Sequence, residues 1–207
     1  MKDISLNKMH LKVAFEQFAS NPGTLPKLKW WLTRAHSAER WFQFEYAFQL
    51  DECLAPSHRV ICERKYVDIV VVPNTPSDKM LCELEPTAKL ELKVNGNWYV
   101  IGKTYPDIKA DMAKATDKHK DTQSAMLAMW IAARPKDCKM LYKWIADQID
   151  DGTGRERMDD IEREMEKECG PGIQLLSKHS FSDDDDFDTL ELRLYCYANQ
   201  PLAEQAL

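Results

Sequence analysis

The stretch AKLELKV, residues 88–94, alternates apolar and charged side chains and decides which fold to expect. Leu90, Leu92 and Val94 occupy one side of the alternation, and Glu91 and Lys93 occupy the other. Because successive side chains of a β-strand point to opposite faces of a sheet, the pattern predicts a half-buried strand. The charged face is either wetted by solvent alone or forms half of a metal-dependent active site.

The run VDIVVV, residues 67–72, predicts a second strand in which Asp68 is the only charged residue. An isolated carboxylate on a buried strand costs several kcal/mol of desolvation unless it is paired or bound to a metal ion. If the two strands are neighbours, Asp68, Glu91 and Lys93 converge on one patch. Two carboxylates can hold Mg²⁺, and a lysine can orient an attacking water or stabilise the charged transition state of phosphodiester hydrolysis.

Helices and strands alternate along the rest of the chain. Hydrophobic periodicity and turn residues predict helices within residues 1–20, in 26–54 with a bend near Ser37, in 105–120 and in 136–150. Further strands are predicted at residues 59–66, 80–85, 98–102, 124–133, 172–181 and 189–198. This order indicates a mixed α/β fold with a central sheet between helices.

The chain is expected to form a single domain over residues 1–207. Within it, residues 1–36 are predicted to be an N-terminal helical extension and residues 37–135 the core that carries the site. Residues 136–207 would add a helix and two late strands.

The central residues resemble the PD-(D/E)xK nuclease superfamily, which has the restriction-endonuclease-like fold. The likeness rests on Asp68 in KYVDIVVV and on Glu91 with Lys93 in LELKV, and by element order it covers residues 37–135. It implies a mixed central β-sheet flanked by α-helices, Asp68 and Glu91 as metal ligands, and Mg²⁺ or Mn²⁺ as the cofactor. Lys93 would position the water. Val67 stands where the family commonly has proline.

The family usually has a further acidic residue on the helix before the first motif strand. Glu45 in WFQFEYAFQ is the first candidate for this catalytic and metal-binding residue, and Glu39 is the second.

The second half of the motif also has a rival in CELE, where Glu83 and Glu85 would replace Glu91 and Lys93. Fourteen residues separate Asp68 from Glu83, whereas twenty-two separate it from Glu91. The better alternation of residues 88–94 and the helix predicted after them favour Glu91 and Lys93.

A nuclease also needs cations that contact phosphate near its site. The candidates are Lys65, Lys103, Lys109 and Lys114. Aspartates interleave with the last three, so ordinary ion pairs along a helix are the alternative. The aromatic residues of the helical region 26–54 are expected mainly in the core and in a homodimer contact.

Composition excludes some classes of protein. The formal net charge of −6 argues against a protein that coats nucleic acid through positive charge alone. The six cysteines form no CxxC pair, which favours reduced thiols in a cytoplasmic protein over a structural zinc site. No apolar run is long enough to suggest a membrane span.

The expected function is therefore metal-dependent hydrolysis of DNA phosphodiester bonds. Two alternatives stay open. One is a module of the same fold that binds nucleic acid or protein without cutting. The other is an acidic partner protein that inhibits an enzyme.

Overall fold

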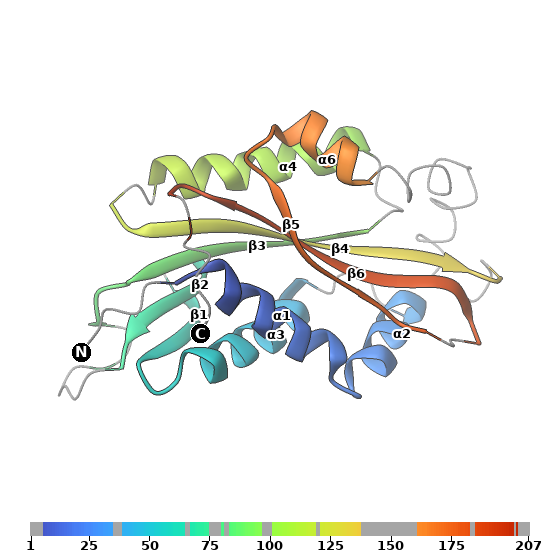
Figure 1. Cartoon of the computed structure of the whole chain (residues 1–207), viewed down its shortest axis with the longest axis horizontal. Helices are drawn as coiled ribbons and strands as arrows, with labels where there is room; N and C mark the ends of the chain where they lie inside the picture. Colours follow the sequence, from blue (N-terminus) through green and yellow to red (C-terminus); the bar gives the residue numbers. More distant parts are fainter. Residues whose placement is uncertain are drawn as a thin grey trace.

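A computed structural model describes residues 6–34, 39–64, 67–74, 80, 83–96, 101–118, 121–137, 161–182, 185–200 and 202. In chain order its elements are α1 (Lys8–Ser20), α2 (Thr24–Arg34), α3 (Glu39–Leu54), β1 (His58–Arg64), β2 (Val67–Pro73), β3 (Ala88–Gly96), α4 (Ile101–Ala113), the π-helical turn η2 (Lys114–Lys118), β4 (Gln123–Pro135), α6 (Ile161–Cys169), β5 (Gln174–Ser180) and β6 (Phe187–Ala198) (Figure 1). None of the helices in these ranges is both long and apolar enough to cross a membrane.

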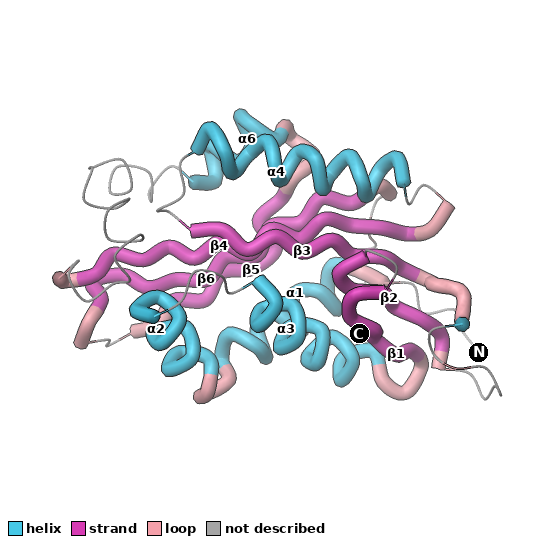
Figure 2. Tube along the Cα trace, turned by 180° about the vertical axis from the view of Figure 1, so that it is seen from behind, coloured by secondary structure: helices cyan, strands magenta, loops and turns pink. Residues whose placement is uncertain are grey.

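The strands form one six-stranded sheet in the order β1-β2-β3-β4-β6-β5. Neighbours are antiparallel except for β3 and β4, which run parallel. A parallel pair needs a crossover, and α4 with η2 supplies it over one face of the sheet. Figures 1 and 2 show α4 and α6 on that face and α1, α2 and α3 on the other. The predicted mixed α/β sheet between helices is confirmed.

β4 lies at the centre of the sheet, and its sequence shows why. Every residue from Ser124 to Ala133 is buried, as expected for a continuous apolar run that is covered on both faces. Leu127 and Met129 pack in the core beneath α1, α2 and α3, whereas Met126 and Ala128 pack with Ile108 of α4. The prediction of a buried strand at 124–133 is confirmed.

α3 packs its apolar stripe between the sheet and α1. Phe42, Tyr46 and Leu50 recur at helical spacing and are fully buried. The hydroxyl of Tyr46 donates a hydrogen bond to the carbonyl of Leu11 in α1 at 3.0 Å. Asn7 is the N-cap residue of α1, and its side chain accepts the backbone N–H of His10 at 2.9 Å. The N-terminal helices therefore share one core with the sheet.

Several predicted elements agree closely with the structure. Strands appear at the positions predicted for 59–66, 67–72, 88–94, 172–181 and 189–198. The helical region predicted at 26–54 corresponds to the two helices α2 and α3, of which α2 begins two residues earlier, at Thr24. The described cysteines are free thiols, as expected: Cys53, Cys62, Cys169 and Cys196.

Two strand predictions are wrong within the described residues. In 80–85, the backbone N–H of Glu83 bonds the carbonyl of Met80 at 2.8 Å, so the chain turns there instead of extending. In 98–102, Ile101 already begins α4. Both segments are short apolar runs, whose strand or helix character periodicity alone cannot decide.

The helical predictions also need two corrections. α4 begins at Ile101 rather than at residue 105, so Pro106 lies inside it. α6 was not predicted, because its sequence is mostly charged and offers few apolar positions besides Met165, which is 1% exposed. The helix predicted at 136–150 lies mostly outside the described residues, and Lys136 and Asp137 are not helical.

Candidate functional site

β2 and β3 bring Asp68, Glu91 and Lys93 to one face of the sheet. In their antiparallel pairing Ile69 lies opposite Leu90, and both side chains are buried beneath α1 and α3. The regular pairing ends at this pair, and extended by one residue it would bring Asp68 level with Glu91. Because side chains alternate, Glu91 projects to the other face of β3, which α4 covers. Lys93 shares that face because it is two residues beyond Glu91.

Asp68 lies where the regular backbone ladder is interrupted on both sides of β2. Toward β3, its Oδ2 accepts the backbone N–H of Leu92 at 2.7 Å. Toward β1, the register would place Glu63 opposite Asp68, but Glu63 has a φ of 53° and is not one of the paired residues. The carbonyl of Asp68 instead accepts Nε2 of Gln43 at 2.6 Å. Irregular backbone of this kind is concentrated at functional sites.

α3 supplies two polar side chains to this region. Gln43 is 3% exposed and stands on the buried stripe of the helix. Glu39, one turn earlier, begins α3, and its Oε2 lies 3.5 Å from Nζ of Lys93. The side chains of Lys93 and Glu39 are 27% and 40% exposed, so their ion pair lies at the edge of the site. Glu91 is buried, with 3% exposed.

The crossover adds a second acid and base pair. Asp111 of α4 is 8% exposed, and its Oδ1 lies 2.5 Å from Nζ of Lys114, the first residue of η2. The carboxylate of Asp111 acts electrostatically on both Asp68 and Glu39, and the ammonium of Lys114 acts on both Asp68 and Glu91. The cluster therefore combines carboxylates from β2, β3, α3 and α4 with two lysines.

Burial and like charge make ionisation of Asp68 and Glu39 costly. Burial is the main cause that raises the pKa of Asp68, and the nearby carboxylate of Asp111 raises it further. The hydrogen bond from Leu92 and the charges of Lys114 and Lys93 act in the opposite direction. Burial likewise raises the pKa of Glu39, against the lowering effect of Lys93. A bound cation would relieve this crowding of negative charge.

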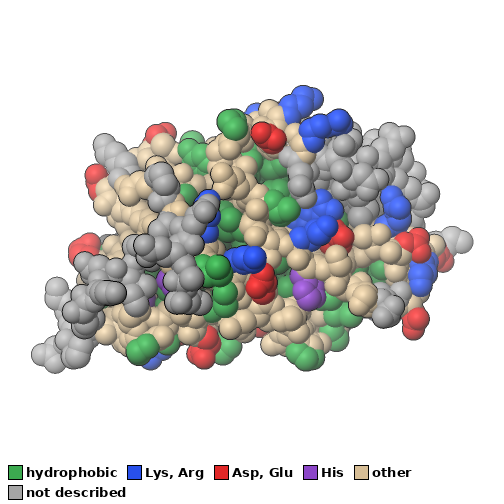
Figure 3. Space-filling view, viewed as in Figure 1, with side chains coloured by type: hydrophobic (Ala, Val, Ile, Leu, Met, Phe, Trp, Pro, Cys, Tyr) green, Lys and Arg blue, Asp and Glu red, His purple; other side chains and the backbone are tan. Residues whose placement is uncertain are grey.

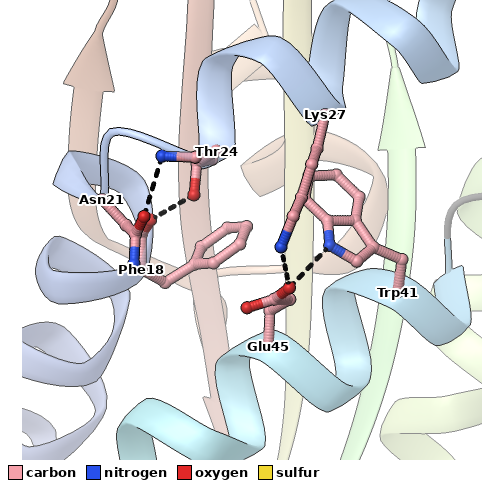
Figure 4. Close-up of polar contacts among 7 residues, drawn as sticks. Phe18, Asn21, Thr24, Lys27, Trp41 and Glu45 are labelled. Atoms are coloured by element: carbon pink, nitrogen blue, oxygen red, sulfur yellow. Dashed lines mark hydrogen bonds and ion pairs between the residues drawn. The ribbon is translucent and has the colours of Figure 1, made fainter.

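Glu45, the first candidate on the helix, contacts α2, whereas Glu39, the second candidate, contacts Lys93. Its Oε1 accepts Nε1 of Trp41 at 3.2 Å and also pairs with Nζ of Lys27 in α2. Figure 4 shows this contact on the α2 side of α3. The hydrogen bond from Lys27 is the main cause that lowers the pKa of Glu45. The reason for the difference is helical geometry, since residues six apart point in different directions.

The side chains of two of the predicted phosphate-contacting lysines are described, and of these two only Lys114 lies at the cluster. Lys109 of α4 pairs with Glu168 of α6, with 3.7 Å between Nζ and Oε2. Lys65 and the side chain of Lys103 lie outside the described residues. Among the described side chains, acidic and basic groups are interspersed on the face shown in Figure 3, without a continuous basic stripe.

The rival motif residues Glu83 and Glu85 are exposed and lie outside the sheet. Oε2 of Glu83 accepts the backbone N–H of Met80 at 3.1 Å, which closes the local turn. These residues therefore do not share a strand face with Asp68, whereas Glu91 and Lys93 do.

The side-chain oxygens of the cluster can be compared with the ligands that a metal ion requires. In the part of the chain that the structure describes, no group of three or more His, Cys, Asp or Glu side chains is arranged to hold one. Asp68 and Glu91 offer two hard oxygen donors on one face. Mg²⁺ keeps several of its waters and is commonly bound through one or two carboxylates, so two such ligands fit its chemistry.

Sequence reasoning missed Gln43 and Asp111, although both had a signal. Gln43 is the one polar residue on the otherwise apolar buried stripe of α3, where it needs a hydrogen-bond partner. Asp111 was considered only as a partner for helix lysines, but it lies three residues after the buried Ile108 on the covered face of α4. In both helices the available signal was a polar residue at the same helical spacing as the buried apolar residues.

Comparison of the chain with protein-family models, with curated proteins and with solved structures finds no match. The assignment of a function therefore depends on the geometry and chemistry of the cluster.

Proposed function

We propose that the protein is a metal-dependent nuclease that hydrolyses DNA phosphodiester bonds at the cluster of Asp68, Glu91 and Lys93. The observation that supports this most is the antiparallel pairing of β2 with β3, at the end of which the carboxylate of Asp68 accepts the backbone N–H of Leu92, between Glu91 and Lys93. The order of elements also suits a restriction-endonuclease-like fold. An acidic helix, α3, precedes the strand of Asp68, and the helix α4 follows the strand of Glu91 and Lys93.

Each side chain would have a distinct role. Asp68 and Glu91 would hold Mg²⁺ or Mn²⁺, and Asp68 is oriented for this by the N–H of Leu92. When bound, the ion would polarise the phosphoryl oxygen and lower the pKa of a water. Lys93 would orient the attacking water, and Glu39 would hold the ammonium of Lys93 in place. Gln43 would fix the backbone beneath Asp68.

The test is cleavage of supercoiled plasmid DNA by the purified chain in Mg²⁺, in Mn²⁺ and in EDTA. Lys93→Met and Asp68→Asn should abolish cutting while the circular dichroism spectrum stays that of the parent. Lys12→Met is the control, because Lys12 pairs with Glu16 on α1, a helix on the other face of the sheet. Cutting that survives both Lys93→Ala and Asp68→Ala would refute the assignment.

A second candidate is a module of this fold that binds nucleic acid or a protein without cutting. It is favoured by one observation, namely that no three-ligand acidic group is preformed among the described residues. The two candidates differ in a simple way. A binding module would retain its affinity for its partner in EDTA and would release no cut product in any divalent cation.

A further inference from the structure

Lys114 and Asp111 form a pair that the roles above do not use. Lys114 Nζ lies 2.5 Å from Asp111 Oδ1, and their side chains are 40% and 12% exposed. The carboxylate is therefore buried beneath an ammonium that reaches solvent. An ammonium has three N–H donors, so a single bond to Asp111 leaves capacity for another acceptor.

The backbone that carries Lys114 is firmly anchored. The next residue, Ala115, is fully buried against the sheet, and its carbonyl accepts the hydroxyl of Ser124 at 2.5 Å. Lys114 also begins a π-helical turn, and such turns occur frequently at functional sites. A long side chain that extends from a fixed backbone and is held by a buried acid keeps its charge in one place.

The charges around Lys114 are those of the proposed active site. Its ammonium attracts Glu91 and Asp68 as well as Asp111, and these acids raise the pKa of Lys114. A phosphodiester that approached the acids without a neighbouring cation would be repelled. Lys93 is already paired with Glu39. Lys114 thus combines a solvent-exposed ammonium, held by the buried Asp111, with electrostatic interactions with both proposed metal ligands.

Resting on the proposed function, we propose that Lys114 binds a non-bridging oxygen of the DNA phosphate at the Asp68–Glu91 pair, and that Asp111 is the positioning residue that orients its ammonium. The scissile phosphate would then be bound between the cation of η2 and the site on β2 and β3. The occupant is a nucleic-acid phosphate group, recognised through charge and not through its base sequence.

The experiment measures binding of a fluorescein-labelled DNA duplex by anisotropy, in Mg²⁺ and in the Lys93→Met background, where the duplex stays intact. Lys114→Met should weaken binding several-fold and reduce the slope of log affinity against log salt by about 1. Lys12→Met is the matched control, because Lys12 pairs with Glu16 on α1 at 3.7 Å and is 45% exposed, similar to Lys114. It should leave both the affinity and the slope unchanged.

The Asp111→Asn variant distinguishes a role of Asp111 in orienting Lys114 from an effect of its negative charge alone. If only net charge mattered, removing this carboxylate would tighten DNA binding, and that result would overturn the positioning role. Weaker binding with an unchanged salt slope is the result we expect, since the cation remains but is no longer oriented. Glu16→Gln on α1 serves as the parallel control.

The inference and the proposed function can fail separately. If Lys114→Met binds DNA as tightly as its parent while Lys93→Met still abolishes cutting, the role of Lys114 is refuted and the nuclease stands. If the parent neither binds nor cuts DNA, both fall.

Discussion

The carboxylate of Asp68 accepts the backbone N–H of Leu92 at 2.7 Å, so a side chain of β2 takes the place of a backbone partner for β3. The bond holds one carboxylate oxygen in a defined position beside β3, next to Glu91. It also ties the geometry of the site to the pairing of two strands.

Asp68→Asn should make the metal-free protein more stable at pH 7. The folded-state pKa of Asp68 is raised from 3.8, chiefly by burial, so the folded protein holds this proton more tightly than the unfolded chain does. The stabilisation that the protonated carboxyl group of Asp68 contributes is fully present below pH 3.8. It is lost as the pH rises through the raised folded-state pKa. Urea denaturation in EDTA should show the gain at pH 7 and its disappearance below pH 3.8. A variant less stable than the parent at pH 7 contradicts this account.

Divalent cations should raise the melting temperature of the parent protein. A ligand that binds only the folded state stabilises it by mass action, by about 2.7 kcal/mol at a hundred times its dissociation constant. Asp68→Asn and Glu91→Gln should lose this shift, whereas Glu16→Gln on α1 should keep it. The measurement is differential scanning fluorimetry with increasing MgCl₂ or MnCl₂ at constant ionic strength. An equal shift in all four proteins would show that the ions bind elsewhere.

Glu39 and Glu45 provide a matched pair on one helix. Glu39→Gln should lower cleavage by loosening Lys93, which lies 3.5 Å away, with little change in stability. Glu45→Gln should leave cleavage unchanged and cost roughly 0–1 kcal/mol of stability, the usual value of an exposed ion pair such as that with Lys27. The pKa of Glu45 is lowered from 4.5, so its stabilisation is present above that pH and is lost as the pH falls through its folded-state value. Cleavage kinetics and urea denaturation of both variants test whether Glu39 affects cleavage while Glu45 affects only stability.

Gln43→Met should destabilise the fold and disturb the site together. The substitution keeps the length of the side chain but removes the donor to the buried carbonyl of Asp68, at a cost of roughly 1–3 kcal/mol. Gln49→Met, on the same helix but only half-buried, should change stability by less than about 0.5 kcal/mol. Equilibrium denaturation measures both effects. Equal effects from the two substitutions would show that the bond to Asp68 has no special importance.

Some features of the site followed from local pattern. Alternation in residues 88–94 was sufficient to place Glu91 and Lys93 on one face and to bury Leu90 and Leu92 on the other, because the period of a strand is two. The continuous apolar run 124–133 was sufficient to predict a strand covered on both faces. These predictions depend on backbone geometry alone and needed no knowledge of the neighbours.

Other features depended on elements far apart in the chain. Both Glu39 and Glu45 are acidic residues of one helix, and only the packing of α3 against β2 and α2 shows that the first reaches Lys93 and the second reaches Lys27. The approach of Asp111 and Lys114 to Asp68 likewise depends on the crossover that lays α4 and η2 over the sheet.

The sequence by itself located the six strands of the sheet, although it also predicted two that are absent from the described residues. It further determined the sides of β3 on which its charges project and the mixed α/β class, because each follows from the spacing of apolar residues along a few consecutive positions. Only the tertiary structure decided the contact of Asp68 with Leu92, the pairing of Glu39 rather than Glu45 with Lys93, and the position of Asp111 and Lys114 over the sheet. The physical reason is that such contacts join segments whose relative position is set by packing of the whole core, which no local period encodes.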